Sequence, residues 1–437
     1  MKAGPDLPIA FVESLDYEGR GVAHVEGKTI FIEGALPGEL VEFETFRRKP
    51  SFERAHALCI LRASPHRIEP RCASFGVCGG CSMQHLEPRA QVAAKQRVLE
   101  DNLRRIGKVR AEMLLAPIHG PTWEYRYRAR FGARYVQRKG TTLVGFRERK
   151  RSYIADMPAC EVVPSRISAL LLPLRELINT LSIRERMPQV ELAMGDTVDT
   201  LTFRNLDPLT PADETALRVF SDRHGVQVFL QPEGPDTVVL LHPPGAPQLE
   251  YRLPEFDLLF HFSPTEFTQV NPAVNRMLVR RALALLDPQP GERVGDLFCG
   301  LGNFSLAIAR RGAFVHGIEG SPVLVERARA NAQRNALDAR CRFEARDLFK
   351  LTPEDWAALG EFDKLLVDPP RDGAIELVKA LGAAGPKRVV YVSCNPGTLA
   401  RDAEVMVHVN GYRLAAAGVV NMFPHTSHIE SMAIFER

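Results

Sequence analysis

Short apolar runs alternate with glycine turns over the first sixty or so residues. The runs predict strands at 7–15, 21–25, 29–32, 39–46 and 52–61. The turn signals between them are Gly19, Gly27, Gly34 and Pro37-Gly38. Short strands at regular spacing are typical of a small all-β barrel. We therefore predict such a barrel over residues 1–63.

The following segment mixes a helix with further strands. Pro88 at its start and Gly107 just past its end predict a helix over 89–106. Strands are expected at 198–203, 226–230, 237–241 and 258–262. We assign residues 64–262 to an α+β central domain.

Helices and strands alternate regularly from about residue 263. Asn271 and Pro272 can cap a helix over 272–286. Apolar strands then end at Leu297, Ile318, Val367 and Val392. Such alternation is typical of a doubly wound, mostly parallel sheet, so we predict a Rossmann-like α/β domain over residues 263–437.

Composition and charge narrow the class of protein. With 437 residues, 45% of them hydrophobic, the chain is long enough for two to four domains. It has no apolar stretch that could span a membrane, and no apolar segment follows residues 1–6 as in a secretory signal. We therefore expect a cytoplasmic protein, and nothing in the sequence requires more than a monomer.

The charge is distributed unevenly along the chain. Residues 1–160 hold 27 Lys and Arg against 18 Asp and Glu, a net charge of +9, and the remainder holds 29 against 35, a net charge of −6. A basic front half suits a nucleic-acid-binding region joined to an enzyme, although a merely solvated surface has the same composition. Period-2 spacing puts Arg126, Arg128 and Arg130 on one strand face, which is either an RNA surface or a solvent-facing edge strand.

A glycine turn follows the first strand of the predicted α/β domain. Gly300 and Gly302 allow a ligand to approach the backbone, and Glu319, after the next strand, can accept hydrogen bonds from ribose hydroxyls. A dinucleotide site shares these features. However, Ser305 replaces the third glycine of that motif, and Asp296 suits a cationic sulfonium better than a pyrophosphate. The pattern therefore favours S-adenosylmethionine.

Two more aspartates follow strands of this domain. Asp347 either holds the adenine amino group or caps a helix. Asp368 begins the run Asp-Pro-Pro and is expected beside the substrate crevice at the carboxyl ends of the strands.

Another apolar strand ends at Cys394. A buried structural cysteine is the ordinary alternative, but Pro396 and polar neighbours indicate a loop and an accessible thiol. A thiol has a use in methylation at C5 of uracil: its addition at C6 makes C5 nucleophilic, and a base must then remove the C5 proton. Glu430 is the candidate base, although a lone glutamate is more often a surface residue.

Four cysteines form a further constellation. Cys72, Cys78 and Cys81 lie within ten residues, and Cys160 is more distant. In a reducing compartment, such crowding indicates metal binding or catalysis rather than disulfides. Four thiolates can hold zinc or a [4Fe–4S] cluster, and their spacing alone leaves that choice open.

Five motifs follow one another in the second half of the chain. They are Ser263-Pro-x-x-Phe-x-Gln269-Val-Asn271, Asp296-Leu-Phe-Cys-Gly-Leu-Gly-Asn303-Phe, Leu366-Val-Asp368-Pro-Pro-Arg371, Val392-Ser-Cys394-Asn-Pro396 and His425-Thr-x-His428-x-Glu430. In these motifs the chain resembles the bacterial 23S ribosomal RNA uracil-C5 methyltransferases, most closely the iron–sulfur type that acts on uracil 1939. The resemblance covers nearly the whole chain.

This resemblance implies roles for particular residues. Cys394 would be the nucleophile and Glu430 the base. The implied contacts to S-adenosylmethionine come from Gln269, Phe298, Asn303, Glu319, Asp347 and Asp368. The implied ligands of a [4Fe–4S] cluster are Cys72, Cys78, Cys81 and Cys160.

The resemblance also has implications for the domains and the substrate. The barrel would be a TRAM domain, an OB-like RNA-binding module, and the helix over 89–106 would pack on the catalytic domain. The substrate would be 23S rRNA, with the target uridine flipped out of its stack.

Three alternatives stay open on the sequence. Asp368-Pro-Pro is similar to an N-methyltransferase signature, but Arg371 replaces its aromatic residue. A ribosome-assembly factor that only binds RNA would leave Cys394 and Glu430 without a use. A different 23S uridine, or a transfer-RNA uridine, is an alternative target because base choice depends on RNA shape.

Overall fold

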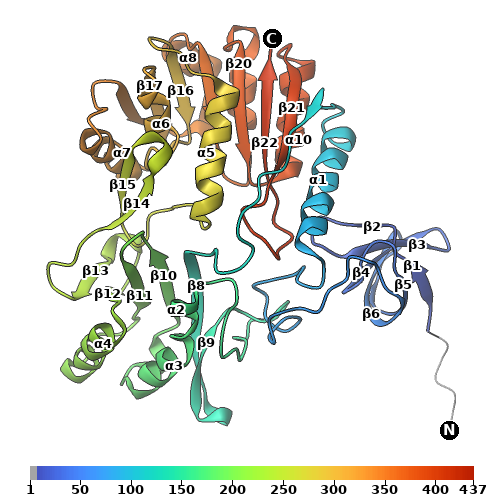
Figure 1. Cartoon of the computed structure of the whole chain (residues 1–437), viewed down its shortest axis with the longest axis vertical. Coiled ribbons are helices and arrows are strands. Elements are labelled where there is room, and N and C mark those ends of the chain that lie inside the picture. The colour runs from blue at the N-terminus through green and yellow to red at the C-terminus, as the bar shows by residue number, and fades with distance from the viewer. Residues whose placement is uncertain (1–6) are drawn as a thin grey trace.

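The computed structural model describes residues 7–437 and contains three larger sheets and one hairpin (Figure 1). Residues 1–6, on which the expectation about a secretory signal partly rests, lie outside the described residues. Within residues 7–437, no helix combines the length and the apolar character needed to cross a membrane.

The N-terminal strands form a six-stranded sheet in the order β1-β5-β6-β4-β3-β2. They are β1 (Ile9–Phe11), β2 (Ser14–Leu15), β3 (Gly21–Val25), β4 (Lys28–Glu33), β5 (Leu40–Arg48) and β6 (Phe52–Arg62). The strand predicted over 7–15 is broken in two because the chain changes partner there: β1 pairs with β5, whereas β2 pairs with β3. Buried Val12, at the break, contributes to the core of the barrel.

The central sheet has the order β13-β12-β11-β10-β8-β9. Its strands are β8 (Arg128–Val136), β9 (Thr141–Gly145), β10 (Gln189–Met194), β11 (Asp199–Arg204), β12 (Gln227–Gln231) and β13 (Val239–His242). Its helices are α2 (Ser165–Ser168), α3 (Leu171–Thr180) and α4 (Pro211–His224), of which α3 packs on β9 and α4 on β12.

The predicted arginine face is wrong in part. Arg126 precedes β8, and β8 is an interior strand between β10 and β9. Arg128 is largely enclosed, and burial lowers its pKa to about 10. Arg130 is exposed and pairs with Glu191, so the three side chains do not form one solvent-facing row.

The C-terminal sheet has eight strands in the order β18-β17-β16-β19-β20-β22-β21-β7. They are β7 (Met113–Leu114), β16 (Arg293–Leu297), β17 (Phe314–Glu319), β18 (Cys341–Ala345), β19 (Lys364–Val367), β20 (Arg388–Ser393), β21 (Arg413–Val420) and β22 (Glu430–Glu436). Strands β16 to β20 are parallel, and β22 runs antiparallel to both of its neighbours. The predicted doubly wound domain is confirmed in this part of the chain.

Within the described residues, six helices from the C-terminal part of the chain accompany this sheet. They are α5 (Pro272–Leu286), α6 (Ser305–Arg310), α7 (Pro322–Arg334), α8 (Pro353–Ala358), α9 (Ile375–Leu381) and α10 (Pro396–His408). The predicted cap of α5 is confirmed, since the Asn271 side chain accepts a hydrogen bond from the Val274 amide. The short 3₁₀ helices are η1 (Gln137–Lys139), η2 (Arg184–Arg186), η3 (Pro235–Thr237), η4 (Pro254–Phe256), η5 (Leu348–Lys350) and η6 (Gly382–Ala384).

Helix α1 (Pro88–Arg105) belongs spatially to the C-terminal sheet, although the chain reaches it directly after the barrel (Figure 1). It packs on α10 and β21. The hairpin of β14 (Leu249–Leu253) and β15 (Leu258–Phe262) lies between the central and C-terminal sheets, and β15 packs on α7.

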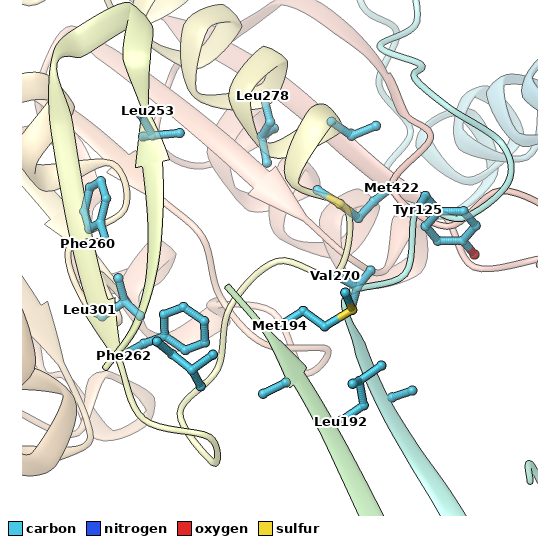
Figure 2. Close-up of a cluster of buried hydrophobic side chains, with 14 of the residues drawn as sticks. Tyr125, Leu192, Met194, Leu253, Phe260, Phe262, Val270, Leu278, Leu301 and Met422 are labelled. Carbon is cyan, nitrogen blue, oxygen red and sulfur yellow. The ribbon is translucent and has the colours of Figure 1, made fainter. Parts of the chain in front are cut away.

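One hydrophobic core continues from the central sheet into the C-terminal sheet. Figure 2 shows Met194 and Leu192 of β10 in the same cluster as Leu278 of α5 and Phe260 of the hairpin. All four side chains are nearly or fully buried. The two sheets therefore support each other, and the C-terminal sheet does not rest on its own helices alone.

Candidate active site

Cys394 and Glu430 lie next to each other at the carboxyl edge of the C-terminal sheet. Ser393, the last residue of β20, pairs with Ser431 of β22. Cys394 follows the first of these residues and Glu430 precedes the second, so both lie one position beyond the same pair. The antiparallel pairing of β20 with β22 thus brings together two residues that are 36 positions apart in the sequence.

Cys394 opens into a cavity of about 700 Å³. Other residues that line this cavity include Tyr17, Arg126, Arg371, Phe423 and His428. The Cys394 side chain is half-buried, which confirms the accessible position predicted for the thiol. Glu430 lies deeper and is only 6% exposed.

Burial dominates the electrostatics of this pair. It raises the pKa of Glu430 to about 8; the charge of Asp368 adds to the rise, and Lys95 opposes it. It also raises the pKa of Cys394 to about 11, with Glu430 and Asp368 adding to the rise and Arg371 opposing it.

Asn395 fixes the turn that carries the thiol. Its side-chain amide donates to the Arg371 carbonyl at 3.1 Å, and its side-chain oxygen accepts from the Gly397 amide at 3.0 Å, which caps α10. The Thr398 hydroxyl donates to the same Arg371 carbonyl at 3.1 Å. The loop after β19 and the loop after β20 are thereby held as one unit.

The glycine turn after β16 forms a backbone cradle. Gly300 and Gly302 have φ of 56° and 94°, and space is open where a Cβ would stand at Gly300. Glu319 accepts from the Gly300 amide at 3.1 Å and from the Ser321 amide at 3.0 Å. Buried Asp296 bonds the Ser305 hydroxyl through one oxygen, and its other oxygen has no hydrogen-bond partner among residues 7–437.

These features fit a small cationic cofactor with a ribose. Burial raises the pKa of Asp296 to about 7, and a nearby positive charge would stabilise its ionised form. Asp368, at the end of β19, has its pKa raised to about 7 for the same reason. Its amide donates to the Leu297 carbonyl at 3.1 Å, which holds it beside the glycine turn.

The other residues that are predicted to contact the cofactor differ from one another in burial and in their neighbours. The Phe298 ring faces Phe349 at 5.6 Å, and half-buried Gln269 lies in the segment between β15 and α5. Asp347 is exposed, caps η5 through the Phe349 amide and pairs with Lys350.

Asn303 already has protein partners for its side chain. It accepts from the Tyr251 hydroxyl at 2.9 Å and from Asn275 at 3.1 Å, and it donates to the Asn275 oxygen at 3.0 Å. These bonds tie the glycine turn to the hairpin and to α5.

The four clustered cysteines converge on one small cavity. Cys72, Cys78, Cys81 and Cys160 all line a space of about 10 Å³, with apolar Phe146 and Met157 beside them. The Gly80 amide donates to the Cys78 sulfur at 3.4 Å. Four thiols suit zinc or an iron–sulfur cluster. However, no group of three or more His, Cys, Asp or Glu side chains in the described part of the chain has the geometry of a metal site.

A basic groove of about 750 Å³ adjoins the Cys394 cavity. Its cationic lining is Arg20, Arg126, Arg130, Arg134, Arg147, Arg149 and Lys150. Glu18, Gly79, Gly80 and Arg126 line both spaces, so the groove adjoins the cavity of the thiol.

Sequence reasoning missed a buried polar face on α1. Gln91 and Lys95 are 0% and 2% exposed and lie against the segment before Glu430. The sequence does contain a signal for this face: Gln91 and Lys95 are four positions apart, so they lie on one side of the helix together with apolar residues.

Comparison with known proteins places this site in a family. The tRNA (uracil-5-)-methyltransferase family matches residues 89–437, which is most of the chain. The chain belongs to the tRNA (uracil-5-)-methyltransferase family. A TRAM domain matches residues 10–58, in agreement with the predicted barrel. The family match begins at α1, which fits the packing of that helix on the C-terminal sheet.

Several relatives in this family are similar over nearly their whole length. A protein of Aromatoleum aromaticum named 23S rRNA (uracil(1939)-C(5))-methyltransferase RlmD is 60% identical, with 99% of this chain and 100% of that protein covered. One of the same name from Nitrosospira multiformis is 60% identical, with 98% of both chains covered.

A solved structure is similar along the whole chain as well. It is the tRNA (uracil-54, C5)-methyltransferase of Pyrococcus abyssi in complex with S-adenosyl-L-homocysteine. The TM-score is 0.74 at 25% identity, with 98% of this chain and 100% of that chain covered. The multidomain fold with a methyltransferase sheet is therefore shared.

Proposed function

We propose that the chain is an S-adenosylmethionine-dependent enzyme that methylates C5 of a uridine in 23S rRNA, at position 1939. The observation that carries the proposal is the juxtaposition of Cys394 and Glu430, with Asp368 near both of them and bonded through its amide to Leu297, just before the glycine turn. A thiol and a carboxylate at one edge are what C5 methylation needs, and an N-methyltransferase has no use for them. The names of the near-full-length relatives support the choice of RNA and of position.

Each of the two residues has one task in this reaction. The Cys394 thiol loses its proton to solvent, and the sulfur lone pair of the thiolate then adds to C6 of the flipped-out uracil, so that the electron pair of the C5–C6 double bond becomes available at C5. Bound S-adenosylmethionine would supply the methyl group that C5 takes up and would leave as S-adenosylhomocysteine. Glu430 then accepts the C5 proton; the freed pair restores the C5–C6 double bond, and the C6–sulfur bond breaks to release the thiolate of Cys394.

The cofactor is held by the cradle in this proposal. Glu319 accepts from the ribose hydroxyls, and Asp296 and Asp368 face the sulfonium with their raised pKa values. Phe298, Gln269 and Asp347 complete the contacts around the adenine and the methionine end, and Asn303 acts by holding the turn.

The four cysteines hold a [4Fe–4S] cluster in this proposal. Support comes from the chemistry of four thiols that line one space and from the Gly80 amide that donates to the Cys78 sulfur, although the described side chains do not stand in the geometry of a metal site. The cluster would have a structural role in this proposal. Cys81 is followed directly by Ser82 and Met83, whose amides both donate to the His425 carbonyl at 2.9 Å, so the cysteine loop supports the segment before Glu430.

The proposal divides the chain into three parts with different roles, namely residues 1–63, 64–262 and 263–437. The barrel and the basic groove bind RNA phosphates, and the C-terminal part performs the chemistry. A ribosomal RNA substrate implies that the enzyme works in the cytoplasm. Its monomeric state stays a prediction.

Trapping of the covalent adduct tests the mechanism. Cys394→Ala is expected to abolish both the denaturant-stable RNA–protein adduct and methyl transfer, whereas Glu430→Gln is expected to accumulate the adduct because the C5 proton cannot leave. Cys59→Ala, at an exposed cysteine of the barrel, is the matched control and should behave as wild type. A Glu430→Gln enzyme with full turnover would contradict the assignment of the base.

A further inference from the structure

Helix α1 buries a charged side chain for which the proposed chemistry has so far given no use. Lys95 is 2% exposed, and its ammonium donates to the Asn421 side-chain oxygen at 2.8 Å and to the Phe423 carbonyl at 2.9 Å. A buried lysine is costly unless it is paired, since its charge is removed from water. Neither of these two acceptors carries a formal charge. The two hydrogen bonds alone therefore do not explain why a lysine is buried at this position.

The segment that Lys95 holds leads directly to Glu430. Residues 421–429 connect β21 to β22, whose first residue is Glu430. Phe423 and His428 of this segment line the cavity of the Cys394 thiol. Lys95 fixes the beginning of the segment. A displacement of its ammonium would therefore displace both the residues that line the Cys394 cavity and the start of β22.

Gln91, one turn before Lys95, fixes the middle of the same segment. Its side-chain oxygen accepts from the His425 amide at 2.8 Å. Its side-chain nitrogen donates to the Met83 and Leu86 carbonyls at 3.0 and 2.7 Å. The two residues together form a buried polar clamp, defined as Gln91 and Lys95, between α1 and the segment 421–429.

Charged and titratable groups face Lys95 from two sides. Glu430 faces it from β22, and His425 and His428 face it from the segment 421–429. Glu430 also faces Asp368, whose negative charge opposes its ionisation. One Glu430 oxygen is buried without a hydrogen-bond partner in residues 7–437. Burial lowers the pKa of Lys95 to about 7, and the charge of Glu430 opposes this drop. Among the groups that shift the pKa of Glu430, Lys95 opposes the effect of Asp368.

We infer that Lys95 is a positioning residue for Glu430: through Asn421 and Phe423 it holds the segment that leads to Glu430, and it places its amine near the carboxylate that takes the C5 proton. The inference rests on the proposed function. In the step concerned, the C5–H bond breaks, its electron pair forms the C5–C6 double bond, the C6–sulfur bond breaks, and the proton goes to Glu430. Lys95 exchanges no proton in this step.

The test separates adduct formation from proton release. Lys95→Met keeps the length of the side chain and removes its charge, and Arg97→Met, on the exposed side of α1, is the matched control. RNA tritiated at C5 of uridine reports proton release, and a denaturing gel reports the adduct. For Lys95→Met we expect release slowed about tenfold at pH 7, accumulation of adduct, and a pH midpoint about one unit higher, because a neighbouring charge of opposite sign shifts a carboxyl pKa by about that much.

Two further variants keep the test decisive. Asn421→Ala leaves the ammonium in place and removes one hydrogen bond, so it should slow release without moving the pH midpoint. In a Glu430→Gln background, where release is already blocked, Lys95→Met should leave the amount of adduct unchanged, since the carboxylate that it positions is then absent.

Three results would overturn the inference. They are a folded Lys95→Met enzyme with the wild-type pH profile, equal losses of adduct formation and proton release, and less adduct in the double variant than in Glu430→Gln alone. Wild-type protein that neither forms an adduct nor releases tritium would instead overturn the proposed function.

Discussion

Replacement of Glu430 by glutamine should stabilise the folded protein at alkaline pH while it blocks turnover. Burial and the charge of Asp368 raise the pKa of Glu430 from its ordinary 4.5 to about 8 in the folded protein. The folded state therefore binds this proton more tightly than the unfolded state does. The stability that comes from the protonated form is fully present below pH 4.5 and is lost as the pH rises through 8.

The magnitude follows from this pKa difference. Each pKa unit corresponds to about 1.4 kcal/mol, so a rise from 4.5 to about 8 amounts to at most about 5 kcal/mol. Glutamine does not titrate and has nearly the shape of the protonated acid. The free energy of unfolding of Glu430→Gln relative to wild type should thus grow between pH 4.5 and 8 and stay constant above that.

Urea denaturation at a series of pH values measures this difference. Buried Trp356 of α8 reports the unfolding of the C-terminal sheet by its fluorescence. Glu404→Gln, at an exposed position of α10, controls for the loss of one negative charge. A relative stability of Glu430→Gln that is the same at pH 5 and pH 9 would refute the reasoning, because it would mean that burial does not hold the proton on this carboxyl.

Three further predictions concern the cofactor cradle, a helix cap and the basic groove. Gly302→Ala would bring a Cβ to 2.7 Å from Leu306 Cδ1 at a φ of 94°, so it should destabilise the fold by about 1–3 kcal/mol and weaken S-adenosylmethionine binding in calorimetry. At Asp213, hydrogen bonds from Ser182 and Thr210 outweigh the effect of burial and lower the pKa to about 2, so Asp213→Ala should cost about 1–2 kcal/mol at pH 7. This difference should shrink as the pH falls from 3.8 through 2, and a constant difference in acid unfolding would contradict it. Arg149→Glu should weaken RNA binding and reduce the slope of its salt dependence by about one or more in a filter-binding titration, and an unchanged slope would exclude a phosphate contact.

The sequence predicted the elements well where the pattern of apolar positions was periodic. The helix over 272–286 matches α5 at both ends, because Asn271 and Pro272 set its start, and the strand over 21–25 matches β3. The first barrel strand was harder to predict. The chain changes its partner strand inside one apolar run, and such a change does not alter the spacing of apolar residues in the sequence.

The candidate site could be predicted only as separate residues. Its two chemical groups were found from the strand ends, but their contact depends on β22 running antiparallel beside β20, which local pattern does not encode. Likewise, the burial of Lys95 depends on the packing of α1 against a segment more than 300 residues away in the chain. Asn303 shows the converse, because its motif indicated a cofactor contact while Tyr251 and Asn275 use its hydrogen-bonding groups.

Transfer of labelled methyl groups from S-adenosylmethionine to unmodified 23S rRNA, with bulk transfer RNA in parallel and the product bases identified, tests the central claim most directly. The account predicts label in 5-methyluridine at position 1939 of 23S rRNA, and its absence with Cys394→Ala. Label only in transfer RNA, at another 23S uridine, or on a ring or exocyclic nitrogen would contradict the proposed substrate or the proposed chemistry.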